Sequence, residues 1–207
     1  MQLYQPTEPE IAAAVSLLTS RLPDDAARIA RGAALLPALG YETAADRNGY
    51  WQDAGLPFRV NADPGWMIPA APDERRNAAD AEDSTPRSYN VSEDNCDCWQ
   101  RQIAEVAGGT LHCRHTLCVL LYREIVAAKL NALAGARAID LRPAGRYPHC
   151  YDVVSIWGRT VAGVQYAPMA DRWVFDDDAG LARFAAWLTT DEAMSEIVRH
   201  QAREEYA

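Results

Sequence analysis

The sequence predicts an α+β protein with helices near the N-terminus, a β-hairpin and a helix in the middle, and a small C-terminal unit of β-hairpin and helices. Apolar residues recur at intervals of three and four near both ends and after residue 115, which is typical of amphipathic helices. Between them lie short β-like runs separated by Gly and Pro. With 207 residues, the chain is long enough for one or two domains whose cores need no disulfides.

The N-terminal region, 1–54, is predicted to be mainly helical. A first helix is expected over 9–20, where Pro occupies the first position and the apolar residues recur at helical intervals. A second helix is expected to begin at Pro23 and to end near Pro37 or Gly40, because Pro cannot continue a helix. The two helices therefore lead as a pair into the next region.

The middle region, 55–134, is predicted to contain the first strands. Runs at 50–60, 66–68 and 88–91 are short and rich in aromatic and β-branched residues. The segment 70–87 is polar, rich in Ala and poor in aromatic residues, so it cannot bury enough surface to order itself. We expect an exposed insertion loop there, with a passive surface loop favoured over a mobile arm.

Two close pairs of metal-ligand residues form the most specific pattern in the chain. Cys96 and Cys98 are separated by one residue, and Cys113 and His115, also separated by one residue, follow after a spacer of fourteen. Zn²⁺ accepts thiolate and imidazole in a tetrahedral shell, and four protein ligands leave no open position for substrate. Ligands at i and i+2 would diverge by about 200° on a helix. The pattern therefore predicts one structural Zn²⁺, held by non-helical backbone or at a helix edge.

Two neighbouring residues offer alternative ligands. Cys118 follows His115 by three residues, although a buried free thiol is the favoured interpretation because Cys packs as a small apolar residue. His112 is a weaker substitute. The apolar residues of 117–133 keep helical spacing as far as Gly135, which is a plausible C-terminal stop. His115 is therefore expected in the first turn of a long helix.

The segment 135–150 is predicted to be a linker because it concentrates Gly, Pro and Arg. The C-terminal unit, 151–207, is expected to start with a β-hairpin over 151–166 and a third strand over 172–175. Three consecutive Asp residues, 176–178, favour a helix N-terminus over a metal site, because carboxylates cap helices well. A last helix is expected near the C-terminal end.

The pattern of polar residues favours a protein that is not an enzyme. His149 and Cys150 have the types of a base and a nucleophile, but neighbours in sequence seldom have the required geometry and no third orienting residue is evident. The sequence has no Gly-rich phosphate loop, HExxH helix or G-x-S-x-G motif. A zinc ion with four protein ligands also has no vacancy for water.

The four ligands and their surroundings resemble the SWIM zinc finger, a family with the pattern Cys-x-Cys, a variable spacer and Cys-x-His. The resemblance covers about 55–134, in which 88–91 is similar to the strand entering the first pair and the helix after His115 to the helix leaving the second. The residues at 99–100 replace the usual proline and aromatic, and Arg114 stands where many members have Lys. The resemblance implies a β-hairpin and a helix around one structural Zn²⁺.

The same resemblance implies the class of partner. SWIM fingers occur in chromatin-remodelling helicases, transposases and recombination-mediator subunits, often beside a recombinase. This predicts an accessory protein associated with nucleic acid, with DNA and another protein, such as a recombinase or a helicase, as partners. The alternative is a protein–protein interaction adaptor in which the zinc module is a structural scaffold. Binding to phosphate would weaken steeply with salt, whereas an apolar protein interface would barely respond.

Charge is distributed unevenly along the chain. The totals are 20 basic and 29 acidic residues, a net charge of −9, which argues against an unspecific nucleic-acid coat. Residues 99–146 carry a balance of +4, so the remainder carries −13. If nucleic acid is bound, the predicted contacts are the basic residues Arg101, Arg114, Arg123 and Lys129. The alternative is a set of solvated side chains near two helix ends.

Cysteine usage and hydropathy predict a cytoplasmic protein. The five Cys residues are an odd number, four of them lie within 96–118, and no N-terminal apolar run follows a basic start, so a secreted disulfide framework is not expected. No window approaches eighteen uninterrupted apolar residues, so no membrane partner is expected. Arginine outnumbers lysine nineteen to one, which favours a GC-rich prokaryotic or phage genome.

Overall fold

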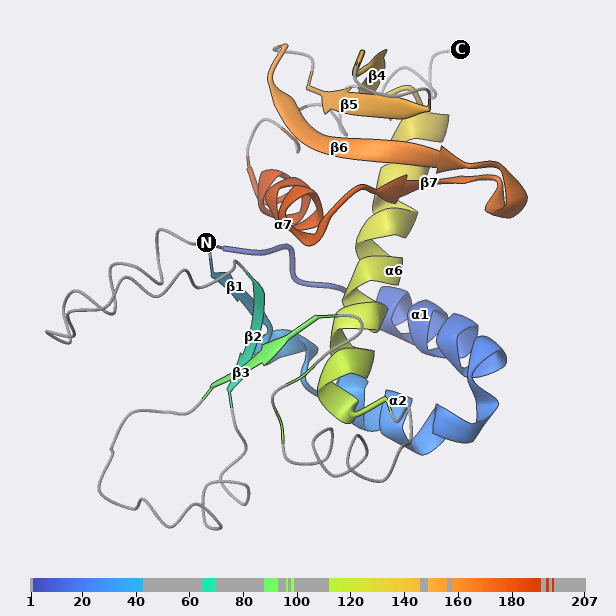
Figure 1. Cartoon of the computed structure of the whole chain (residues 1–207), viewed down its shortest axis with the longest axis vertical. Helices are drawn as coiled ribbons and strands as arrows, with labels where there is room; N and C mark the ends of the chain where they lie inside the picture. The colour runs from blue at the N-terminus through green and yellow to red at the C-terminus, as the bar shows by residue number, and fades with distance from the viewer. Residues whose placement is uncertain are drawn as a thin grey trace, which may run out of the picture. The chain divides into compact units, whose positions relative to one another are not determined.

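Figure 1 shows a computed structural model of the chain. The structure describes residues 2–42, 65–69, 88–92, 96, 98, 112–145, 149–155, 158–190, 193 and 195. In these residues it contains four α-helices and two antiparallel sheets, so the predicted α+β class is confirmed. The chain divides into two compact units, Gln5–Tyr122 and Met1–Tyr4 with Arg123–Ala207. The predicted domain boundaries near 54, 134 and 150 stay predictions.

The unit Gln5–Tyr122 begins with the predicted pair of helices. Its helical segments before the first strand are α1 (Glu8–Arg21), η1 (Pro23–Asp25), α2 (Ala26–Ala33) and η2 (Leu36–Ala38). The Thr7 N–H donates to the Glu10 carboxylate at 2.8 Å, which secures the start of α1. Leu18 of α1, Ile29 of α2 and Leu36 of η2 are buried, so these three segments each turn an apolar side toward the core, whereas η1 has no buried residue.

Three strands form the first sheet: β1 (Gly40–Glu42), β2 (Gly65–Pro69) and β3 (Ser88–Val91). Tyr41 and Val91 both oppose Trp66, which is fully buried and meets the Tyr122 ring edge-on at 5.5 Å. The strands expected at 66–68 and 88–91 are therefore present. The run expected at 50–60 and the predicted loop 70–87 lie outside the described residues.

The long helix expected after the second ligand pair is α6 (Arg114–Gly135), and it spans the boundary between the two units. Leu117, Val119 and Leu121 are fully buried in its first half. Burial on several sides of the helix explains why its sequence has few charges there. No helix in the described ranges is long and apolar enough to cross a membrane.

The second unit contains a four-stranded antiparallel sheet in the order β4-β5-β6-β7 (Figure 1). Its elements after α6 are β4 (Asp140–Pro143), β5 (Cys150–Val154), β6 (Thr160–Ala167), η3 (Pro168–Ala170), β7 (Arg172–Phe175) and α7 (Asp178–Trp187). The expected hairpin, third strand and capped helix are all present. Strand β4 lies inside the segment 135–150 that was predicted to be a linker. The expected last helix lies mostly outside the described residues.

Among the described strands, β7 lies at one edge of this sheet, and a side chain of α6 bonds to the backbone of one of its residues. Asn131 Nδ2 donates to the Trp173 carbonyl at 3.0 Å, and the Trp173 N–H donates to Asn131 Oδ1 at 2.8 Å. The Asn131 side chain thus bonds to both backbone groups of Trp173, which an edge strand would otherwise leave free to pair with another strand. The Arg172 guanidinium adds an ion pair with Glu124 of the same helix at 2.7 Å.

Candidate metal centre

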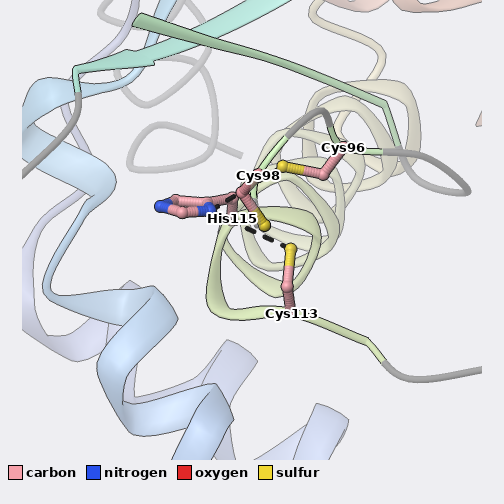
Figure 2. A group of neighbouring side chains, drawn as sticks. All are labelled: Cys96, Cys98, Cys113 and His115. Carbon is pink, nitrogen blue, oxygen red and sulfur yellow. Dashed lines mark hydrogen bonds between the residues drawn. The ribbon is translucent and has the colours of Figure 1, made fainter. Parts of the chain in front are cut away.

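The two predicted ligand pairs come together in one buried group. The ligand atoms of Cys96, Cys98, Cys113 and His115 all lie within 4.8 Å of one another, and each of the four residues is at most 2% exposed. Figure 2 shows the three sulfurs and one edge of the imidazole facing a common space. We call this group the Cys/His cluster. Its donor set, spacing and burial mean that it could hold a metal ion.

The backbone around the Cys/His cluster matches the expectation from the i, i+2 spacing. Cys96 forms an isolated antiparallel bridge with Val91, the last residue of β3, so the first pair begins on extended backbone. Cys113 directly precedes α6, and its carbonyl accepts the Leu117 N–H at 3.1 Å. His115 lies in the first turn. The cluster therefore joins the end of a strand to the start of a helix.

Cys113 occupies the N-cap position of α6 with a sulfur in place of the usual oxygen. The Thr116 N–H donates to Cys113 Sγ at 3.4 Å, and the Thr116 hydroxyl donates to the Cys113 carbonyl at 2.9 Å. This is the contact that a Ser or Asp side chain makes at a helix start, and the positive end of the helix dipole favours a thiolate there. Sequence reasoning missed Thr116, although its place three residues after Cys113 is the N3 position of the cap.

The pKa values of Cys96, Cys113 and His115 are shifted in different directions. A hydrogen bond with Cys113 raises the pKa of Cys96, followed by one with Cys98 and by burial. Hydrogen bonds from Cys96 and Cys98 lower the pKa of Cys113, which therefore carries the negative charge. Burial lowers the pKa of His115, but its contacts with the Cys113 and Cys98 sulfurs outweigh burial and raise it to about 9. Without an ion, the lowered pKa of Cys113 therefore favours a thiolate beside a protonated His115.

The imidazole of His115 is oriented with Nδ1 toward the sulfurs. Nδ1 lies 3.7 Å from Cys96 Sγ and 3.9 Å from Cys113 Sγ (dashed lines in Figure 2). The Tyr89 ring of β3 lies against the imidazole, with the ring centroids 4.7 Å apart. Nε2 is buried and has no hydrogen-bond partner among the described residues. Nδ1 is therefore the nitrogen that could coordinate an ion.

Neither alternative ligand belongs to the group. Cys118 is fully buried, and burial raises the pKa of its thiol to about 12, as expected of a free thiol packed among apolar side chains. His112 is half-buried and lies just before the second ligand pair. Within the part of the chain that the structure describes, the Cys/His cluster is the only group of three or more potential metal ligands.

The basic residues predicted to contact nucleic acid lie in different surroundings. Arg101 is outside the described residues. Arg114 is the half-buried first residue of α6, between two members of the Cys/His cluster. Arg123 forms an ion pair with Asp178 at 3.0 Å, and Lys129 Nζ lies 5.3 Å from the centre of the Tyr4 ring. Their contact with nucleic acid stays a prediction.

The geometry of the Cys/His cluster fits a single small ion. Tetrahedral coordination at a Zn–S distance of about 2.3 Å places sulfurs roughly 3.8 Å apart. The observed ligand atoms, all within 4.8 Å of one another, need only small side-chain movements to reach that spacing. Comparisons with protein-family models, with curated proteins and with solved structures find no match for this chain. The SWIM resemblance therefore rests on the four residues and their spacing.

Proposed function

We propose that this chain is a non-enzymatic zinc-binding protein whose Zn²⁺ ion is structural. The burial of three thiols and one imidazole within 4.8 Å of one another is the observation that carries the proposal. Thiolate and imidazole are ligands that Zn²⁺ prefers, whereas Mg²⁺ and Ca²⁺ prefer oxygen. Four protein ligands complete a tetrahedral shell, so the ion has no open position at which to activate water.

A structural ion at this place would cross-link distant segments of the chain. It would tie Cys96, bridged to the end of β3, to Cys113 and His115 at the start of α6. Burying several thiols and an imidazole without an ion leaves polar and charged groups away from water, which is unfavourable. Zinc would displace the protons of the cluster and form four coordinate bonds. The free energy of zinc binding would therefore also stabilise the fold.

Metal analysis tests the zinc assignment. Protein purified without chelator should contain one equivalent of zinc, and Cys98→Ser should lose most of it. Cys150→Ser is the matched control, because Cys150 is a free cysteine of β5 outside the Cys/His cluster, and this variant should keep its zinc. Less than about half an equivalent in the wild type, or full occupancy in Cys98→Ser, contradicts the assignment.

The SWIM resemblance supports a more specific role, an accessory protein associated with DNA in recombination, repair or transposition. An acidic protein can approach phosphate only through a segregated basic face, and 99–146 carries +4 in a chain with net charge −9. Arg101 and Arg114 are the preferred contacts, because Arg101 lies in the spacer between the ligand pairs and Arg114 between two ligands, so the ion would hold both. A recombinase, a helicase or a similar protein is the expected macromolecular partner.

A salt titration of DNA binding tests this role against the protein adaptor. Replacing Arg101 and Arg114 with Ala should weaken binding and reduce the slope of log K against log salt by roughly 1 to 2, about one unit for each lost phosphate contact. Arg142→Ala is the control, since Arg142 is exposed in β4 and pairs with Asp140. No detectable binding of wild type to single- or double-stranded DNA at about 50 mM salt favours the adaptor.

A further inference from the structure

A side chain of helix α2 contacts the residue that directly precedes the second ligand pair. Arg28 Nη1 donates to the His112 carbonyl at 3.2 Å, and Nη2 of the same guanidinium lies 3.0 Å from Asp25 Oδ1. His112 directly precedes Cys113, so the hydrogen bond restrains the peptide that carries a member of the Cys/His cluster. The ion pair with Asp25 at Nη2 helps to orient the Arg28 guanidinium, so that Nη1 points toward the His112 carbonyl.

The backbone of α2 makes a second contact with the same segment. A Cβ atom on Gly32 would lie 2.9 Å from the Arg114 carbonyl oxygen and 3.1 Å from the Cys118 amide nitrogen. Only Gly allows this approach, because the atoms that would have to move belong to backbone. Gly is a poor helix former, so its place inside α2 is explained by the close packing and not by helix propensity.

From these two contacts we propose that α2 is a positioning element of the metal centre. Arg28 and Gly32 fix the backbone of 112–118, so that Cys113 Sγ and His115 Nδ1 are presented together before an ion binds. The proposal rests on the zinc site proposed above and adds two residues that do not coordinate the ion. Groups that orient ligands from outside the coordination shell commonly change metal affinity by about 10- to 100-fold.

Arg28→Gln tests the side-chain contact, with Arg31→Gln as the matched control. Arg31 lies on the same helix, is exposed, and its Nε donates only within the helix, to the Ala27 carbonyl. Arg28→Gln should bind Co²⁺ and Zn²⁺ about 10- to 100-fold more weakly, and its Co²⁺ ligand-field bands should shift because the ligands are less well fixed. Arg31→Gln should match the wild type in affinity and spectrum.

Gly32→Ala tests the backbone contact, with Gly135→Ala as its control. A Cβ on Gly135, at the end of α6, would meet nothing within 4 Å, so that variant should bind Co²⁺ normally. Gly32→Ala should weaken binding and shift the Co²⁺ bands in the same direction as Arg28→Gln. If either variant fails to fold, Asp25→Asn serves in its place, because it releases the Arg28 guanidinium from its carboxylate partner and keeps a residue type suited to the start of α2.

The outcomes separate this inference from the zinc assignment. A wild type that binds neither Co²⁺ nor Zn²⁺ overturns the proposed zinc site and this inference with it. A wild type that binds both ions, together with folded Arg28→Gln, Gly32→Ala or Asp25→Asn proteins that have wild-type affinity and Co²⁺ spectrum, overturns only the positioning role of α2. Weaker binding with shifted bands in these variants, and unchanged binding in the controls, supports it.

Discussion

The Cys/His cluster and the core between β6, β7 and α7 are both closed to solvent, but they differ in composition. The cluster contains four groups that can carry charge, whereas Val164, Phe175 and Phe184 fill the other core with hydrocarbon. Burial of hydrocarbon is favourable by itself, but burial of thiols and an imidazole is favourable only when their polar atoms have partners. The unit Gln5–Tyr122 should therefore depend on an ion, whereas the sheet of the other unit should not.

The same contrast appears at the starts of two helices. Cys113 caps α6 with a sulfur that also belongs to the Cys/His cluster, so metal binding and helix start are coupled there. Asp177 caps α7 with a carboxylate oxygen that accepts the Gly180 N–H at 2.5 Å. The second cap needs no ion. Of these two helix starts, only that of α6 should therefore be affected when the metal is removed.

Removal of the metal should have the largest effect. Apparent zinc binding worth on the order of 10 kcal/mol is coupled to folding at such sites. Chelation should therefore abolish hydrogen-exchange protection at Thr116 and Leu117, whose N–H groups bond to the sulfur and the carbonyl of Cys113. Amides of β5 and β6 should keep their protection, because their pairing involves no member of the cluster.

Cys113→Ala should reproduce the effect of chelation without any chelator, since it removes a ligand and a cap together. Cys118→Ala provides the comparison within the same helix, because Cys118 is buried but lies outside the Cys/His cluster. It should keep its zinc. Unchanged protection of the α6 start in metal-free protein, or loss of protection in β5 and β6, would contradict the division of the molecule into a metal-dependent and a metal-independent region.

A change of pH should have the next largest effect. Cys96 and His115 retain protons near neutral pH because their pKa values are raised, to about 9 for His115, whereas the lowered pKa of Cys113 leaves a thiolate. Zinc must displace the retained protons, so binding should release at least two of them, and log K should rise by at least about 2 per pH unit below about pH 9. Affinity therefore falls as pH falls.

Calorimetric titration in buffers with different ionisation enthalpies counts these protons. In metal-free protein, the contribution of His115 to stability changes with pH in the opposite direction to zinc affinity. Its raised pKa stabilises the fold fully below pH 6.5, and this contribution is lost as the pH rises through about 9. Zinc-dependent stabilisation should thus grow with pH while the contribution of His115 to the metal-free fold declines. Release of clearly fewer than two protons near neutral pH would contradict the raised pKa values of Cys96 and His115.

Phe184→Ala should have a smaller effect, confined to the apolar core. Phe184 is fully buried, and its ring centroid lies 5.4 Å from those of Phe175 and Trp187. Its truncation should lower the free energy of unfolding by about 3–5 kcal/mol, measured by urea denaturation with and without chelator. Met169→Ala is the control, because Met169 is 102% exposed in η3 and should have almost no effect. Loss of zinc from folded Phe184→Ala would contradict the separation of the two regions.

Much of this structure could be predicted because the determining interactions are local in sequence. Apolar spacing was sufficient for α1 and α6, and the strand-like runs on either side of Gly158 were sufficient for β5 and β6. The spacing of the two Cys/His pairs was sufficient to predict that they meet, because Cys-x-Cys and Cys-x-His each place two ligands within reach of one ion.

The remaining features depend on contacts between distant residues. Strand β1 has three residues and begins at Gly40, which looks like a helix stop in sequence, and β4 is defined by its pairing with β5 in a segment rich in Gly and Pro. Arg28 and His112 are 84 positions apart, so no spacing pattern predicts their hydrogen bond. Such features come from tertiary packing, which overrides local composition.

Asp177→Ala should have the smallest effect, and it sharpens the comparison between the two helix caps. Loss of the carboxylate leaves the Gly180 N–H without its cap, which should lower the free energy of unfolding by about 1 kcal/mol, while Asp177→Ser should restore most of it. Both values should be the same with and without zinc.

Cys113→Asp supplies the matched test at the start of α6. Its carboxylate can accept the Thr116 N–H, but the metal site loses a thiolate ligand. If helix capping were the main role of Cys113, this variant would behave like Asp177→Ser, but if metal binding is, it should lose zinc affinity despite an intact cap.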